Sequence, residues 1–302
     1  MIGALLGSRS RHENDASAAA DLNWSNAPGE LSTPTGLELQ WVGTAGFRIA
    51  FEGTELWIDP FFTRPGMRRV LGRGAILPDE ALLSRYVQRA DAVLVGHTHF
   101  DHAMDVPWIS ARTGCRVYGS ASLSTLMGLH GLAERAVAVA VHKPFEIGPF
   151  TVTFVPSVHS KLLLGLKIPS DGEFTCDCLD DLGARAYRCG PVYGIHLAVG
   201  GVTLYHQGSA NLLDDEIRHR GVDIFLCGIA GRVFTRRYVE RILRRLEPRI
   251  VVPHHHDDFF RPLDSPMGFS FNVNFGGFAE EVAAVSRDFR VRSLAPLQTI
   301  RA

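Results

Sequence analysis

The segment Gly96-His97-Thr98-His99-Phe100-Asp101-His102 carries three histidines and one carboxylate within six residues, directly after an apolar run typical of a buried strand. Transition metals are bound by nitrogen and oxygen atoms that converge on one point. In an extended segment side chains repeat with period 2, so His97 and His99 point the same way. A turn after His99 would bring Asp101 and His102 toward a second metal. The segment therefore predicts a two-metal hydrolytic centre at the end of a strand.

The same segment has a plainer interpretation, which is a solvated loop rich in histidine. A single histidine more often titrates or forms a hydrogen bond than binds a metal. A solvated loop does not explain why so many potential ligands directly follow a strand that is expected to be buried. We therefore favour metal binding.

The composition indicates a protein with a substantial hydrophobic core. The chain has 302 residues, of which 46% are hydrophobic, enough for one large domain or two small ones. Its 31 basic and 32 acidic residues are nearly balanced, so neither nucleic acid nor an anionic membrane is expected as a partner. No apolar run approaches the roughly 18 residues of a membrane span. The first residues lack a basic leader and make a poor secretion signal.

The cysteines and the missing leader favour a cytoplasmic protein. The five cysteines are an odd number and do not follow the spacing of a disulfide scaffold. We expect them to be reduced thiols. A structural zinc held by Cys176, Cys178 and Cys189 is an alternative, but the single residue between the first two is short for a zinc-binding pair.

The order of the expected elements predicts an α/β fold. Residues 1–36 have a polar, small-residue composition without sustained periodicity, so we expect a flexible N-terminal extension, either mobile or draped over the rest. Residues 37–302 are expected to form a single domain, in which short strands come first and helices and strands then alternate twice over. Later helices are expected over residues 211–219 and from Thr235 to Leu246. This order suits a four-layer αβ/βα sandwich, two sheets face to face with helices outside.

The first metal needs a third nitrogen besides those of His97 and His99. His159 is the favoured candidate, because it follows the strand expected over residues 150–155. Loops at strand ends are where a rigid scaffold positions functional side chains.

The second metal needs a ligand besides Asp101 and His102. Three histidines, His254 to His256, follow the apolar strand Val251-Val252, and only one of them is required. We favour His255. Its two neighbours would then hydrogen-bond the ligands, touch the substrate or be plain loop residues. For His196 and His206, core or supporting roles are favoured over metal binding.

The run from His97 to His102 is the H-x-H-x-D-H signature of the metallo-β-lactamase superfamily, which the chain resembles from Leu37 onward. The resemblance includes His159 and a final histidine after a Val-Val-Pro strand. Residues 57–60 and the Pro253-x-His255 pattern are similar to the branch that contains ascorbate-6-phosphate lactonase and N-acyl-phosphatidylethanolamine phospholipase D. The resemblance implies a sandwich of the metallo-β-lactamase type and one or two zinc ions, with manganese or iron as alternatives. The implied ligands are His97, His99, Asp101, His102, His159 and His255.

One position departs from the pattern of the superfamily. Many members carry a bridging aspartate after a glycine, and here the matching pair is Gly208-Ser209. Ser209 is a poor ligand for zinc, and Asp214 and Asp215 lie too far along the chain to replace the aspartate. The ligand set then resembles the subclass that binds two zincs without a bridging carboxylate. The alternative is a second site that is weak or empty.

Two divalent metals roughly 3.5 to 4 Å apart can share a hydroxide, lower its pKa and polarise the scissile oxygen. Asp101 would orient the nucleophile, and a histidine near the second metal, His255, would protonate the leaving group. This chemistry serves an ester, lactone, amide or phosphodiester bond equally well, so the substrate stays unidentified. The alternative function is a non-catalytic metal-binding or sensor member of the superfamily. An iron-dependent oxidoreductase is a third possibility, which usually includes a flavin-binding partner domain.

Specificity is expected from a segment at about residues 160–192 that would cover the active site. Its apolar part, residues 162–166, favours a lipophilic substrate group or a core-facing role. Phe259 and Phe260 would line the pocket or pack beneath it. Three arginines could bind a substrate phosphate or lie on an exposed helix face: Arg232, Arg236 and Arg237. We therefore expect a small-molecule substrate with an apolar or a phosphate group.

Overall fold

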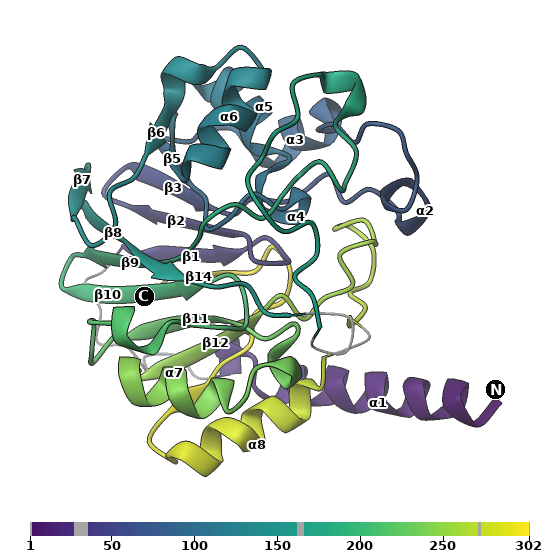
Figure 1. Cartoon of the computed structure of the whole chain (residues 1–302). Coiled ribbons are helices and arrows are strands. Elements are labelled where there is room, and N and C mark those ends of the chain that lie inside the picture. The colour runs from purple at the N-terminus through teal and green to yellow at the C-terminus, as the bar shows by residue number, and fades with distance from the viewer. Residues whose placement is uncertain (1, 27–35, 162–165, 271–272, 302) are drawn as a thin grey trace.

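The computed structural model describes residues 2–26, 36–161, 166–270 and 273–301, with side chains described from residue 11 onward. Within this part of the chain, two seven-stranded sheets pack face to face, and helices cover both outer faces (Figure 1). The predicted four-layer α/β sandwich is confirmed.

The first sheet has the order β14-β1-β2-β3-β4-β5-β6. Its strands are β1 Glu38–Trp41, β2 Phe47–Phe51, β3 Thr54–Ile58, β4 Ala92–Leu94, β5 Arg116–Gly119, β6 Ala136–Ala138 and β14 Thr299–Arg301. The helices that follow along the chain are α2 Met67–Val70, α3 Glu80–Tyr86, α4 Phe100–Ala103, α5 Val106–Thr113 and α6 Ala121–Leu129. Strands β1 to β3 are antiparallel, whereas β3 to β6 run parallel, with α3, α5 and α6 on the outer face (Figure 1).

The second sheet has the order β13-β12-β11-β10-β9-β8-β7. Its strands are β7 Phe145–Ile147, β8 Phe150–Ser157, β9 Val192–Val199, β10 Val202–Gln207, β11 Ile224–Gly228, β12 Ile250–His254 and β13 Arg290–Val291. Helices α7 Tyr238–Leu246 and α8 Phe275–Val285 lie on its outer face (Figure 1). Every residue of the parallel strands β11 and β12 is buried. Strands covered on both faces have near-continuous apolar sequences, as these do.

The main core fills the space between the two sheets. In β1 and β2, buried residues alternate with half-buried ones, so one face of each strand points into this space. Leu39 and Phe47 from the first sheet meet Phe154 and Leu197 from the second. The sheets are thereby held together below the ends of β4, β8, β10 and β12, from which the candidate site is built.

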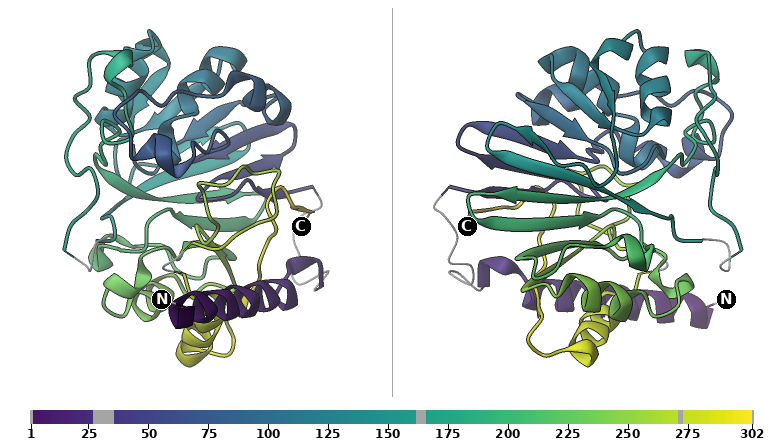
Figure 2. Two further views of the ribbon diagram at one scale, coloured as in Figure 1. Left: turned by 90° about the vertical axis from the view of Figure 1, so that its right-hand side faces the viewer. Right: turned by 60° about the vertical axis from the view of Figure 1, so that its left-hand side comes forward.

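Part of the predicted N-terminal extension has regular structure. Residues Ile2–Asp21 form helix α1, which lies alongside α8 (Figure 2), and Trp24 is buried with the inter-sheet core. The Asp15 carboxylate accepts hydrogen bonds from the backbone N–H groups of Phe275 and Gly276 at 2.8 and 3.2 Å. N–H groups at the start of a helix have no partner within the helix itself, and here Asp15 supplies one. Contacts with α8 therefore stabilise α1, whose own sequence has only weak helical periodicity. Residues 27–35 lie outside the described part.

Two later helices differ from prediction. Only Asp214–Glu216 of residues 211–219 are helical, as one 3₁₀ turn, because the residues on either side of it, Leu213 and Ile217, have extended backbones. Helix α7 begins at Tyr238 and not near Thr235. Arg237 has a left-handed backbone (φ +52°), which a right-handed helix running on from Thr235 could not include. Among the helices described, none is both long and apolar enough to cross a bilayer.

Candidate metal centre

The candidate site lies where strands of both sheets end. After β4, the chain runs through His97 and His99 into the short helix α4, with Asp101 and His102 in its first turn. The second sheet adds His159, just after β8, and His255, just after β12. Because these side chains are anchored to strand ends, the scaffold fixes where they meet.

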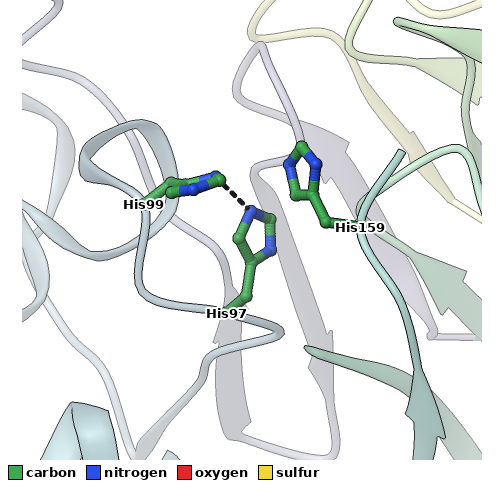
Figure 3. Close-up of side chains that lie close together, drawn as sticks. All are labelled: His97, His99 and His159. Carbon is green, nitrogen blue, oxygen red and sulfur yellow. Dashed lines mark hydrogen bonds between the residues drawn. The ribbon is translucent and has the colours of Figure 1, made fainter. Parts of the chain in front are cut away.

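Three histidines form the first cluster, which we call triad A: His97, His99 and His159. Their potential ligand atoms lie within 4.8 Å of one another, and the three rings point toward one another (Figure 3). His97 Nε2 lies 3.1 Å from His99 Nδ1. Burial lowers the pKa of His97 well below its usual value and that of His159 to about 3. The rings are therefore neutral at pH 7, which is the form that binds a metal.

The second cluster, triad B, consists of Asp101, His102 and His255, whose potential ligand atoms also lie within 4.8 Å of one another. Asp101 Oδ2 lies 3.2 Å from His255 Nε2 and 3.7 Å from His102 Nε2. Burial alone would raise the pKa of Asp101, but the two histidines hold it below its usual range. The carboxylate is thus ionised and able to bind a cation.

The two triads adjoin. The ring centroids of His97, in triad A, and His102, in triad B, are 3.8 Å apart, so the two clusters are in direct contact. Five imidazoles and one carboxylate form a donor set that suits zinc and other first-row divalent ions. The residues present therefore fit the metal centre predicted from the sequence, and the structure brings all six candidate ligands together.

Asp59 orients His102, a role the sequence analysis missed. Its carboxylate lies 2.8 Å from His102 Nδ1 and accepts the Gly96 N–H at 2.7 Å. Burial lowers the pKa of His102, but Asp59 and Asp101 raise it overall. With Nδ1 donating to Asp59, Nε2 faces triad B as a lone pair. A Cβ at Gly208 would lie 2.9 Å from Asp59 Oδ2, so this close approach requires glycine.

A buried ion pair, which the sequence analysis also missed, holds the backbone of His255 in place through two hydrogen bonds. The backbone of His255 is left-handed (φ +59°), and its N–H donates to the Thr44 carbonyl at 2.8 Å. The Thr44 N–H in turn donates to the Asp257 carboxylate at 3.0 Å. Asp257 pairs with Arg64 at 2.6 Å. This chain of contacts holds an unfavourable backbone conformation in place.

The remaining histidines of interest lie outside the triads. His206 and His254 stack with ring centroids 4.9 Å apart, and His206 Nε2 lies 2.9 Å from the Ala45 carbonyl oxygen. His256 packs on Trp41, 4.7 Å between centroids, and all three are fully buried. They support the site from beneath. His196 stacks on His219 instead, at 3.7 Å.

Ser209 lies beside the centre in the position where a bridging aspartate was expected. Its hydroxyl accepts the Ser160 N–H at 2.9 Å and it lines the pocket above the triads. Asp214 is half-exposed and paired with Arg241, so it does not replace the aspartate. Among the described residues, neither cluster of potential metal ligands includes a bridging carboxylate.

A cavity of about 300 Å³ opens above the triads. Its lining combines members of both triads with residues of the 160–192 segment: Pro169, Ser170 and Ala184. The carbonyl oxygen of Pro169 lies 2.8 Å from His99 Nε2, so this segment also contacts a candidate metal ligand of triad A. Leu162 to Gly165 lie outside the described residues, and Leu166 is exposed.

Of the other predicted pocket features, one lines the cavity and the rest lie apart from it. Phe259 is part of the lining, whereas Phe260 packs against Phe259 with ring centroids 4.5 Å apart. None of the three arginines, Arg232, Arg236 and Arg237, belongs to the described lining; Arg232 is buried and pairs with Glu281. Among the described residues, no cluster of three potential ligands contains a cysteine, so the structural zinc is not supported. Cys189 is a buried free thiol whose pKa is raised by burial to about 12.

Comparison with known proteins shows the family of this chain through its sequence. The family described as the beta-lactamase superfamily domain matches residues 38–255. A UPF0173 metal-dependent hydrolase of Carboxydothermus hydrogenoformans is 29% identical over 228 residues, which cover 73% of this chain and 85% of that protein.

Solved structures share the fold at lower sequence identity. The metallo hydrolase Igni18 of Ignicoccus hospitalis superposes with a TM-score of 0.57 at 21% identity, covering 88% of this chain and 98% of that one. CmlA, a diiron beta-hydroxylase of Streptomyces venezuelae, gives a TM-score of 0.59 at 16% identity, covering 89% and 55%. These two likenesses show the fold alone. The match of the family over residues 38–255 shows that the chain belongs to the metallo-β-lactamase superfamily.

Proposed function

We propose that this protein is a metal-dependent hydrolase that binds two divalent ions, one in triad A and one in triad B. The observation that carries the proposal is the pair of adjoining triads beneath a single cavity. The relatives named metal-dependent hydrolases support the general activity. Bound there, a divalent metal would lower the pKa of water and polarise the oxygen of the scissile bond.

Zinc is the metal we propose, with manganese or iron as alternatives. Neutral imidazoles dominate the donor set, which favours zinc over magnesium or calcium. Ser209 supplies no negative charge between the sites, so triad B depends on Asp101 alone for its carboxylate. We expect the second ion to bind more weakly than the first.

Asp101 and His255 are the proposed catalytic residues. Asp101 is ionised and lines the cavity, so it can accept a hydrogen bond from the attacking water and orient it. His255 presents Nε2 to Asp101, whereas its Nδ1 is buried without a partner. One nitrogen cannot hold a metal and release a proton together. Proton donation by His255 therefore belongs to the enzyme with only triad A filled.

The proposed substrate is a small molecule with an ester, lactone, amide or phosphodiester bond, and the proposed location is the cytoplasm. The location rests on the sequence features alone. The narrower similarity to the lactonase and phospholipase branch stays a prediction.

Turnover by the zinc-loaded protein tests this proposal. Generic chromogenic esters, lactones and phosphodiesters should be hydrolysed, and His99→Ala should reduce the rate at least a hundredfold. The His130→Ala variant controls for loss of a histidine away from the cavity. A protein that retains two zinc ions but turns over none of these bonds would instead support the non-catalytic binding function. Turnover gained only with iron and a reductant would favour the oxidoreductase.

A further inference from the structure

We infer that the cavity above the triads receives a neutral, apolar group, so that the substrate is a compact ester, lactone or amide bearing an alkyl or aryl chain. The type of bond cleaved rests on the proposed function. The apolar character of the substrate's side group rests on the residues that line the cavity, and ligand binding tests it without any turnover.

The described lining of the cavity combines two kinds of residue. Triad residues lie there together with four serines, Ser160, Ser170, Ser209 and Ser270. Six further lining residues are apolar and form what we call the apolar wall: Phe100, Pro169, Ala184, Ala230, Phe259 and Val273. A ligand with its reacting group at the triads would therefore contact the apolar wall.

The aromatic part of this wall is held by packing. Phe259 lies 5.6 Å from the ring of His255 and 6.3 Å from that of Phe100, between centroids. Behind them, Phe61 packs edge-on against Phe100 at 5.9 Å, and Phe260 packs against Phe259. Phe100 and Phe259 are both only partly buried, and both line the cavity. Such a half-exposed aromatic surface beside a metal centre favours an apolar ligand.

A negatively charged chain finds no partner in the described lining, which contains neither lysine nor arginine. Two buried arginines near the site are already paired, Arg64 with Asp257 and Arg232 with Glu281. Lys161 follows Ser160 in sequence, but its side chain is exposed and is not part of the lining. Burying a phosphate or carboxylate against the apolar wall would therefore cost free energy without compensation.

The volume limits the size of the group. About 300 Å³ lies at the small end of the range for ligand pockets. A chain of several carbons or one aromatic ring fits this space better than a lipid with two long chains. The inference is thus a short acyl, alkyl or aryl group.

Hydroxamic acids test the inference, because a constant metal-binding head can carry different tails. Acetohydroxamate, hexanohydroxamate and octanohydroxamate would be titrated into the zinc-loaded protein by calorimetry. Two further compounds would have a six-carbon tail ending in a carboxylate or a phosphate. We expect the dissociation constant to fall about fourfold per methylene up to hexanohydroxamate, as for transfer of a methylene out of water. The acidic tails should bind at least tenfold more weakly than hexanohydroxamate.

Variants separate the wall from its surroundings. Phe259→Ala should flatten the dependence on chain length, whereas Phe289→Ala, at a half-buried phenylalanine outside the lining, should change it little. Zinc content of each variant is measured alongside. Tighter binding of an acidic tail, lost in Lys161→Ala, would overturn the inference in favour of an anionic substrate. A dissociation constant independent of chain length, or no hydroxamate binding to zinc-loaded protein, would also overturn it.

The two proposals fail in different ways. Binding that strengthens with apolar chain length, without hydrolysis of any ester, lactone, amide or phosphodiester, would contradict the hydrolase and leave the apolar pocket intact. Hydrolysis of phosphodiesters together with weak binding of the apolar tails would support the hydrolase and contradict the apolar pocket.

Discussion

Arg64 and Asp257 form a buried ion pair beside the metal centre, with Nη2 and Oδ2 2.6 Å apart and side chains only 3% and 1% exposed. Asp257 also accepts the Thr44 N–H, and the Thr44 carbonyl accepts the N–H of His255. A Cβ at Gly43 would lie 1.8 Å from Arg64 Nη2, so the arginine occupies space that only glycine leaves open. The pair thus connects the protein interior to a triad B residue through two hydrogen bonds.

Removing one member of this pair is expected to destabilise the protein and weaken triad B. Asp257→Ala leaves the Arg64 charge buried without its partner, which costs about 3–5 kcal/mol of unfolding free energy. It also frees Thr44, so His255 loses its fixed orientation. Urea denaturation measures the first effect and zinc titration against a chelator measures the second.

The double variant Arg64→Met/Asp257→Leu separates the two effects. Replacing both charges by apolar side chains should restore much of the stability. It should not restore affinity in triad B, because no carboxylate then holds the Thr44 N–H. Wild-type affinity for the second zinc in this double variant would contradict the positioning role.

Asp59→Ala is expected to weaken zinc binding in triad B by about 10–100-fold, as the loss of the partner of a metal-binding histidine usually does. The His102 ring would lose the contact that points Nε2 at the site. Competition with a chromophoric chelator measures the affinity. Asp223→Ala is a matched control, since this carboxylate also binds backbone N–H but at the far end of the second sheet. Equal losses in the two variants would point to general destabilisation.

Ser209→Asp is expected to strengthen the second metal site. A carboxylate next to Gly208 adds the negative charge that the wild-type centre lacks between its triads. Elemental analysis after dialysis against a low, buffered concentration of free zinc should then show occupancy closer to two ions per chain than in the wild type. If the wild type already holds two ions tightly and the variant is unchanged, Ser209 does not limit the second site.

Acid should destabilise the protein partly through His196. Burial, aided by His219, lowers the pKa of His196 to about 4 from the usual value of 6.5. The unfolded chain therefore binds this proton at a higher pH than the folded one. The folded state retains its full stability above pH 6.5, where His196 is neutral in both states. The free energy of unfolding then decreases progressively as the pH falls from 6.5 toward 4. In His196→Phe, the melting temperature should fall less steeply between these pH values; an identical slope would contradict the assignment.

Local sequence patterns predicted most of the architecture. Alternating or continuous apolar runs gave strands such as β2 and β12, because strand burial is a local periodicity. Helix α1 was missed, since its position depends on Asp15 meeting α8 some 260 residues away. Contacts of that kind leave no local pattern.

The six candidate ligands were predictable because histidines and an aspartate cluster at strand ends or in one motif. Their support was not. Asp59 precedes a proline and looks like a strand terminator, yet the fold turns it toward His102. Arg64 and Asp257 are ordinary charges in sequence, and only their burial together makes them a pair. The apolar wall of the cavity also depends on which residues the fold brings together.

Metal content of the purified protein is the most direct test of the central claim. The account predicts about two divalent ions per wild-type chain, with one lost in His97→Ala and one lost in His255→Ala, because each residue belongs to a different triad. A His130→Ala sample controls for purification. One ion per chain, lost in His97→Ala and retained in His255→Ala, would contradict the two-metal centre.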